Sequence, residues 1–400
     1  MIYSVSPFSG LCSFTEGYVW LATPHLFVAK WQSENKLPQH HEGRMINDLA
    51  QRFAENPILG PLDLLPSVEG MEVTCLLNPG VFRFQGKTWL LVRVAERPVQ
   101  VPGKTSFPIL SPEGRLEVLE FNSDDSRLDL SDPRVISFDG QDYLTTLSHL
   151  RLLASDDGIV FSEPEGSRPL MGSGALETYG IEDCRVAQID ETYYLTYTQV
   201  SNNGVGVGLR STRDWKDFDH AGMIFSPHNK DCALFEERID GKYYALHRPS
   251  SPELGGNYIW LAESFDLLHW GNHRCIAHSR KGSWDSARIG AGASPIRTSQ
   301  GWLEIYHGAT KQNRYSLGAL LLDLDEPWRV LARSESPIME PLAPYELEGF
   351  FGQVIFTNGH LVDGDQLTIY YGAADSVICA AHLSLASILA SLAPAPGAKP

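Results

Sequence analysis

The sequence has few basic residues for its length. Among 400 residues, 32 are Lys or Arg and 49 are Asp or Glu, which leaves a formal net charge of -17. No basic stripe balances this charge, so the sequence argues against a nucleic-acid partner. The acidic background also makes any local cluster of cations informative, because an anion would bind there against the net charge of the chain.

Cysteine pairs and long apolar runs are missing as well. The six cysteines are scattered and none forms a C-x-x-C pair, which predicts free thiols in a reducing compartment. The apolar stretch from Val19 to Ala29 is interrupted by Pro24 and His25 and is too short to span a bilayer. We therefore expect a cytoplasmic protein with no membrane partner.

Several common catalytic motifs are also absent. The sequence contains no G-x-x-x-x-G-K-[ST] phosphate loop, no H-E-x-x-H metal motif and no G-x-S-x-G nucleophile elbow. The histidines show no clustered ligand spacing. We therefore expect no metal and no nucleotide chemistry of these kinds.

A strand-turn-strand phrase is the main feature that is present. Its strands are rich in Tyr, Trp, Val and Ile, and Asp, Asn and Gly supply the turns. The copies start about 50 to 60 residues apart, which is typical of an all-β propeller built from repeated sheets. Six hairpins can be counted, so either there are six blades or one hairpin is an insertion. The copies begin at Val81, Val135, Val186, Phe235, Pro295 and Val354.

The remaining segments predict a simple domain organisation. Residues 1–75 lack the repeat and form an extension, in which apolar spacing predicts a helix over Gly43–Glu55 that packs on the propeller. Residues 96–134 read as a long loop with one strand, and Leu383–Leu392 as a short helix. We expect the propeller to cover 76–392 and the proline-containing tail, 393–400, to be disordered.

The phrase Gly180-Ile-Glu-Asp-Cys-Arg185 contains the clearest candidate for acid catalysis. Glu182 and Asp183 are adjacent, so in an extended strand they point to opposite faces and only one can face the axis. A single buried carboxyl is a candidate general acid because desolvation keeps it protonated. The alternative is a structural role for Asp183, in which it binds turn amides or pairs with Arg185.

A set of basic residues occupies matching edges of different repeats. Arg, Lys and His side chains that converge are the usual way to hold a phosphate. Separate salt bridges to acidic neighbours are the alternative for each of them. The set consists of Arg93, His149, Arg151, Lys230, His247, Arg248 and Arg288.

Aromatic residues near carboxylates suggest a sugar ligand. Aromatic faces stack on the C–H faces of a sugar while its hydroxyls take hydrogen bonds. Ordinary packing between blades is the alternative. The residues are Trp302, Tyr306, His307, Phe350, Phe351, Tyr370, Tyr371 and Asp375.

These residues together resemble glycoside hydrolase family 130, the β-mannoside phosphorylases and related β-mannosidases. The resemblance covers about residues 77 to 390, with the motifs in the family's order. It implies a five-bladed propeller, in which the hairpin at 135–147 is an insertion within the first blade. The matching stretches are Leu77–Gly80, Tyr143–Arg151, Gly180–Arg185, Asn229–Phe235, Leu246–Pro249, Trp284–Gly292, Gly301–Gly308 and Tyr370–Asp375.

The resemblance also implies a reaction. Asp183 matches the family's proton donor, and inorganic phosphate, as a co-substrate in place of a cofactor, attacks the anomeric carbon with inversion to give α-mannose 1-phosphate. Arg93, Lys230, His247, Arg248 and Arg288 would bind the phosphate. Asn78, Tyr306, His307 and Asp375 match positions near the sugar. Arg151 and Arg185 would serve either the substrate or the structure.

Three positions depart from the family's pattern. Cys184 stands where Pro is usual, Gly80 where Ala or Ser is usual, and Glu236 where Pro is usual. The first change would loosen the backbone that aims Asp183. None of the three removes a charged group, so they do not indicate a loss of activity.

Two rival functions remain open at the level of sequence. An inverting β-mannosidase needs a carboxylate base for water, and Glu236, Glu237 and Asp285 are candidates. A non-catalytic sugar-binding propeller would bind a mannoside without turnover. The sequence leaves the linkage (β-1,2 or β-1,4), the acceptor sugar and a homo-oligomeric state undecided.

Overall fold

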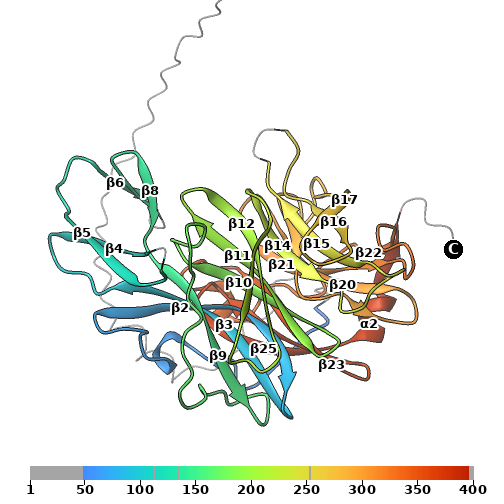
Figure 1. Ribbon diagram of the computed structural model, residues 1–400. Helices are drawn as coiled ribbons and strands as arrows, with labels where there is room; N and C mark the ends of the chain where they lie inside the picture. Colours follow the sequence, from blue (N-terminus) through green and yellow to red (C-terminus); the bar gives the residue numbers. More distant parts are fainter. Residues whose placement is uncertain (1–47, 112, 133–134, 252–253, 396–400) are drawn as a thin grey trace, which may run out of the picture. The chain divides into compact units, whose positions relative to one another are not determined.

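The computed structural model describes residues 48–111, 113–132, 135–251 and 254–395. These residues form seven antiparallel sheets and two short α-helices (Figure 1). None of the helices in these ranges is long and apolar enough to cross a membrane.

Five of the sheets repeat one plan, in which strands that follow one another in sequence lie side by side. Most of their hairpins coincide with the repeated phrase, and Gln85-Gly86 has positive φ at both residues, as a type I′ turn requires.

The first sheet contains β2 (Met71–Phe84), β3 (Lys87–Pro98) and β9 (Leu147–Ser155). The second contains β10 (Ile181–Ile189), β11 (Thr192–Ser201), β12 (Gly204–Thr212) and β13 (Asp219–Phe225). The third contains β14 (Asn229–Leu234), β15 (Tyr243–Pro249), β16 (Ile259–Ser264) and β17 (Trp270–Ala277). The fourth contains β18 (Arg288–Ala291), β19 (Ile296–Arg297), β20 (Trp302–Ala309), β21 (Tyr315–Leu322), β22 (Val330–Ser334) and β26 (Leu392–Pro394). The fifth contains β1 (Gln51–Arg52), β23 (Ile355–Asp363), β24 (Gln366–Ala373) and β25 (Val377–Ser384).

The other two sheets form an insertion between β3 and β9, which pair with each other. The hairpin at 135–147 belongs to this insertion and not to a sixth repeating sheet. The segment 96–134 was predicted to be a long loop with one strand, Leu116–Phe121. That strand is present as Leu116–Asn122, but Lys104–Leu110 and Leu128–Asp132 are also strands. The strands of the insertion are β4 (Lys104–Leu110), β5 (Leu116–Asn122), β6 (Leu128–Asp132), β7 (Val135–Phe138) and β8 (Gln141–Leu144), which lie together in Figure 1.

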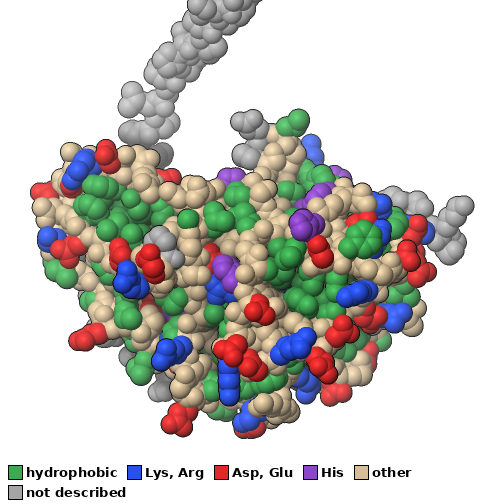
Figure 2. Space-filling view, viewed as in Figure 1, with side chains coloured by type: hydrophobic (Ala, Val, Ile, Leu, Met, Phe, Trp, Pro, Cys, Tyr) green, Lys and Arg blue, Asp and Glu red, His purple; other side chains and the backbone are tan. Residues whose placement is uncertain are grey.

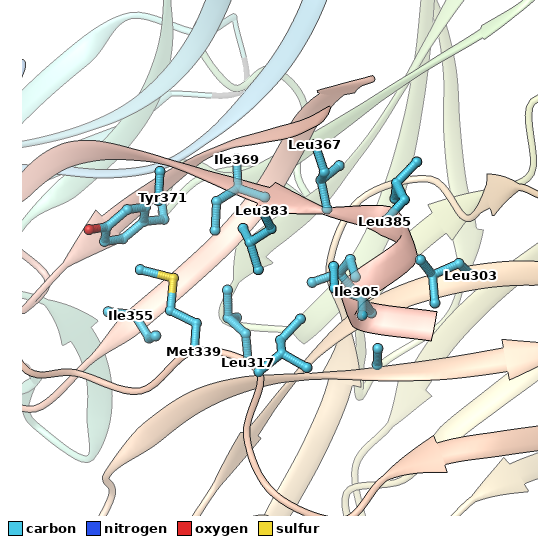
Figure 3. Packing of buried hydrophobic residues seen from close by; sticks show 14 of the residues in the cluster. Leu303, Ile305, Leu317, Met339, Ile355, Leu367, Ile369, Tyr371, Leu383 and Leu385 are labelled. Carbon is cyan, nitrogen blue, oxygen red and sulfur yellow. The ribbon is translucent and has the colours of Figure 1, made fainter. Parts of the chain in front are cut away.

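The hydrophobic core is divided into clusters that lie between neighbouring sheets. One cluster joins the fourth and fifth sheets and includes Leu303, Ile305, Leu317, Ile369 and Leu383 (Figure 3). Other clusters join the first sheet to the second, the second to the third and the third to the fourth. A further cluster joins the fifth sheet back to the first. Each of these sheets therefore packs on the next, and the last packs on the first.

The predicted N-terminal helix over Gly43–Glu55 is wrong where it can be checked. Residues up to 47 lie outside the described ranges, and 48–55 contain β1 instead of a helix. The helical spacing of the apolar residues gave a wrong prediction. A helix would present Leu49 and Phe53 to one surface, but the two residues pack against different core clusters. Pro57 also disfavours helical backbone at the residue before it. A 3₁₀ turn, η3 (Pro61–Asp63), and β2 follow, so the first repeating sheet begins at Met71, before residue 76.

The C-terminal helix is confirmed and is slightly shorter than predicted. α2 (Leu385–Ala390) begins after Ser384, whose side chain accepts a hydrogen bond from the Ser387 backbone N–H. The tail predicted to be disordered from residue 393 begins inside β26, which pairs with β22. Residues 396–400 lie outside the described ranges. The other helix, α1 (Pro344–Leu347), lies before β23.

Candidate active site

Three first strands carry an Asn or Asp in left-handed backbone. Asn78, Asp183 and Asp231 have φ of 32°, 48° and 53°, and each lies at a β-bulge of β2, β10 or β14. Asn and Asp tolerate this conformation better than most residues, and strained backbone of this kind concentrates at functional sites. All three residues line one cavity. In these three sheets the bulge of the first strand therefore turns a polar side chain toward a shared space.

The cavity has a volume of about 630 Å³. It gathers side chains from all five repeating sheets and from the insertion. Seven of the twelve predicted site residues line it: Asn78, Arg93, Asp183, Lys230, Arg248, Arg288 and Asp375. The other five do not line it: Arg151, Arg185, His247, Tyr306 and His307.

Arg93 joins the two adjacent acids of β10. Its Nη1 donates to Asp183 Oδ1 at 3.0 Å, its Nη2 donates to Glu182 Oε1 at 2.8 Å, and its Nε donates to Ser148 Oγ at 2.9 Å. Asn78 Nδ2 also donates to Asp183 Oδ1, at 3.1 Å. The expectation that only one of the two acids faces the cavity is wrong. The bulge between Glu182 and Arg185 breaks the alternation of the strand, so both acids line the cavity.

The surrounding charges give two aspartates of the cavity, Asp183 and Asp375, different acidities. Burial opposes the charge on Asp183, but Arg93, Lys230 and Arg185 together hold its pKa below the ordinary value. Burial raises the pKa of Asp375 to about 6; Arg93 works against this rise, and the charges on Asp183 and Glu182 add to it. Asp183 is therefore ionised at neutral pH, contrary to the prediction that desolvation keeps it protonated.

Asp231 was not among the predicted site residues, although it is the centre of a buried charge cluster. Arg185 Nη2 donates to Asp231 Oδ1 at 3.2 Å, and Arg248 Nε lies 3.0 Å from Oδ2 as an ion pair whose angle is not that of a hydrogen bond. His307 Nε2 lies 3.3 Å from the same Oδ2. The sequence contains a signal that could have identified Asp231. A charged residue, Asp and Cys follow one another both at Glu182-Asp183-Cys184 and at Lys230-Asp231-Cys232.

Two further cations reach the cavity from the third and fourth sheets. Arg288 donates to Tyr315 Oη at 3.1 Å and to Asn313 Oδ1 at 3.2 Å. Both acceptors are neutral, so they do not compensate the positive charge of Arg288. Lys230 lines the cavity, and its ammonium forms no ion pair or hydrogen bond within the described residues. The part of the cavity wall formed by β14 and β18 therefore offers positive charge to an anion.

Another part of the cavity lining is apolar. Of the predicted aromatic group, Phe350 and Phe351 line the cavity, and Val135 and Leu144 of the insertion also contribute. Trp302, Tyr306, Tyr370 and Tyr371 lie instead in the cores between sheets. Apolar and aromatic side chains beside polar groups suit a ligand that has both kinds of surface.

Strand alternation explains why His247 is missing from the cavity. His247 and Arg248 are adjacent on β15 and point to opposite faces, and the structure turns Arg248 to the cavity. His247 stacks on Phe225, with ring centroids 4.3 Å apart, and its Nδ1 lies 3.0 Å from Asn229 Nδ2. Burial lowers the pKa of His247 to about 3, so the ring is neutral and contributes no positive charge.

The four other absent residues have structural partners. Tyr306 Oη donates to Asp285 Oδ2 at 2.9 Å. Arg151 of β9 forms an ion pair with Glu163. His307 contacts the Asp231 carboxylate. Arg185 Nη1 donates to the backbone carbonyl of Asp183 at 2.8 Å.

Two of the departures from the family pattern lie against each other. A Cβ atom at Gly80 would lie 2.9 Å from the carbonyl oxygen of Cys184 and 3.1 Å from Val186 Cγ2. Cys184 is fully buried between the first two sheets. Glycine at position 80 thus makes room for the backbone of the bulge that carries Asp183.

Comparisons with known proteins show the family of this chain. The model of glycoside hydrolase family 130, described as β-1,4-mannooligosaccharide phosphorylase, matches residues 147–393, and the chain belongs to this family. The β-1,2-mannobiose phosphorylase of Listeria innocua is 44% identical over 348 residues, which are 85% of this chain and 98% of that protein. A solved structure of the Listeria innocua β-1,2-mannobiose phosphorylase with β-1,2-mannobiose has a TM-score of 0.81, with 86% of this chain and 98% of that chain covered. The β-1,4-mannooligosaccharide phosphorylase of Ruminococcus albus is 34% identical over 239 residues, which are 58% of this chain and 70% of that protein.

Proposed function

We propose that this protein is an inverting β-mannoside phosphorylase, which uses inorganic phosphate to release α-mannose 1-phosphate. The observation that carries the proposal is the pairing of one acid, Asp183, with a wall of cations in the same cavity. Lys230, Arg248 and Arg288 come from two neighbouring sheets and face that cavity. Phosphate is already an anion, so the reaction needs cations to hold it in line and no carboxylate base.

The steps follow from these positions. A phosphate oxygen attacks the anomeric carbon of the mannosyl unit, the bond from that carbon to the bridging oxygen breaks, and the proton of Asp183 ends on the leaving oxygen. Asp183 must first gain that proton, since the cations keep its pKa low. A bound phosphate dianion offsets the charge of Lys230 and Arg248, which raises the pKa of Asp183 and prepares it as the acid.

The hydrolytic alternative has weaker support from the site. Asp285 is fully buried and pairs with Arg280 and Arg333, and it does not line the cavity. Glu237 pairs with Arg297 on the surface. Glu236 accepts a hydrogen bond from the Gln188 backbone and is also absent from the cavity wall. None of the three proposed bases is placed to activate a water beside Asp183.

The proposal also covers the propeller architecture, the cellular location and the linkage of the substrate. We infer that the five repeating sheets are the blades of a propeller with the cavity on its axis, since each sheet packs on the next and the last on the first. The five cysteines within the described ranges are free thiols, which suits the cytoplasmic location expected from the sequence. We favour a β-1,2-linked substrate, because a relative that is 44% identical over 85% of this chain is a β-1,2-mannobiose phosphorylase.

The test offers β-1,2- and β-1,4-linked mannobiose to the purified protein, with and without inorganic phosphate. We expect phosphate-dependent release of α-mannose 1-phosphate, faster from the β-1,2-linked disaccharide. Asp183→Asn should fold and lose activity by about a thousandfold or more, because the amide has no proton to give. Equal rates of mannose release in phosphate-free buffer would favour the hydrolase, and binding without turnover would favour a sugar-binding protein.

A further inference from the structure

The phosphate-binding role of Arg248 depends on the direction in which its guanidinium points. Its Nε faces Asp231 Oδ2 at 3.0 Å. Within the described residues no hydrogen bond or ion pair occupies its two terminal amino groups. An arginine held by Nε presents these two groups as a fork, which is the geometry that binds two oxygens of a phosphate.

Asp231 is itself held rigidly. It is 2% exposed and lies between Arg185, Arg248 and His307, which come from β10, β15 and β20. Gly290 leaves the space for this arrangement, because a Cβ there would lie 2.2 Å from Asp231 Oδ2 and 2.6 Å from His307 Nε2. Burial lowers the pKa of His307 to about 4, although Asp231 opposes this shift, so the imidazole is neutral at pH 7.

We propose that Asp231 is a positioning residue of the reaction: it holds Arg248 by Nε so that the guanidinium fork faces the phosphate. The inference rests on the proposed phosphorylase function. Asp231 does not position Asp183 to the same degree, because Arg185 also donates to the carbonyls of Asp183, Ala291 and Gly292. Loss of the Asp231 carboxylate should therefore affect phosphate far more than the mannoside.

The substitution Asp231→Asn tests the inference, because the two possible roles of Asp231 predict opposite changes in phosphate affinity. If Asp231 acts only as a nearby negative charge, the substitution removes a repulsion and phosphate binds more tightly. If it orients Arg248, phosphate binds more weakly, by about tenfold or more, as expected for a lost charge-assisted contact. The affinity is measured by calorimetric titration with inorganic phosphate and as the KM for phosphate at saturating mannobiose.

Two further variants complete the design. Arg248→Lys keeps the positive charge but lacks the fork and the Nε, so it should weaken phosphate binding to a similar extent, and the double variant should be no worse than either single one. Asp285→Asn is the matched control, since Asp285 is equally buried between two arginines but does not line the cavity. It should lower the melting temperature without changing the ratio of the two KM values.

Several outcomes would overturn the inference. They are unchanged or tighter phosphate binding in Asp231→Asn, or an equal rise in the KM values of phosphate and mannoside. If Asp231→Asn fails to fold, Arg248→Lys decides alone, and unchanged phosphate affinity in that variant refutes the role of the fork. A wild-type protein that cleaves the mannoside without phosphate would instead refute the proposed function, while the titrations would still decide the role of Asp231.

Discussion

At the scale of single residues, neighbours in sequence have different roles because the backbone turns them differently. Arg248 reaches the cavity while His247, one residue earlier, stacks on Phe225. Glu182 and Asp183 depart from this rule, because the bulge lets both face Arg93. Burial and local charge then give Asp183 and Asp375 different acidities, although both line the same cavity.

Asp375→Asn should change the pH dependence of stability. The folded-state pKa of Asp375 is raised from 3.8 to about 6, so the folded protein binds more protons than the unfolded chain between these values. Its contribution to stability is present below this window and is lost as pH rises through about 6. The variant should therefore be more stable than wild type at pH 8, by about 1–2 kcal/mol after discounting for partial exposure.

Urea unfolding of both proteins at pH 5 and pH 8 measures this difference. The advantage of the variant should shrink at pH 5, where wild-type Asp375 is mostly protonated. A difference that is the same at both pH values would contradict the raised pKa of Asp375.

At the scale of elements, the bulges of the first strands decide what reaches the cavity. β2 and β10 approach so closely that only glycine fits at position 80, against the backbone of Cys184. Both positions depart from the family's pattern, and the structure places them in direct contact. The expected loosening of the Asp183 backbone is offset by this close packing and by the hydrogen bond from Arg185 to the Asp183 carbonyl.

Gly80→Ala should destabilise the protein by about 1–3 kcal/mol, because the new methyl group would lie 2.9 Å from the Cys184 oxygen. Gly271→Ala in β17 is the matched control, since a Cβ there meets no atom within 4 Å. The control should stay within about 0.5 kcal/mol of wild type. Chemical unfolding of the three proteins compares them, and equal stability of the two variants would show that the strands separate easily.

At the scale of the whole molecule, the sheets are joined in sequence order and then back to the beginning. β1 adds the start of the described chain to the fifth sheet, and Arg52 of β1 anchors it with a 2.7 Å hydrogen bond to the buried Glu346. Acidic and basic side chains are mixed on the face shown in Figure 2, and this face shows no basic stripe.

Arg52→Ala should reduce the free energy of unfolding by about 3 kcal/mol, because it leaves the buried Glu346 carboxylate without its cation. Lys87→Ala is the control, since Lys87 pairs with Asp156 at an exposed position. It should cost less than about 1 kcal/mol. A comparison of the two variants by urea unfolding is decisive: similar losses would mean that the β1 anchor contributes little.

Much of the architecture could be predicted from the sequence, because hairpins are local. The alternation of apolar residues and the turn residues marked the strands of all five repeating sheets, and the spacing of the phrase indicated a repeat. Seven of the residues named from the sequence line one cavity, and Asn78 was named only through the family resemblance. They are Asn78, Arg93, Asp183, Lys230, Arg248, Arg288 and Asp375.

The tertiary structure alone decided which polar residues meet and in what state of charge. Asp231 became the centre of a cluster because β10, β15 and β20 bring Arg185, Arg248 and His307 to it from distant parts of the chain. The helix predicted near Leu49 failed for a similar reason, since its apolar residues are drawn to two separate cores. Turns and alternation depend on neighbours in sequence, whereas burial, bulge direction and pKa depend on groups that only folding brings together.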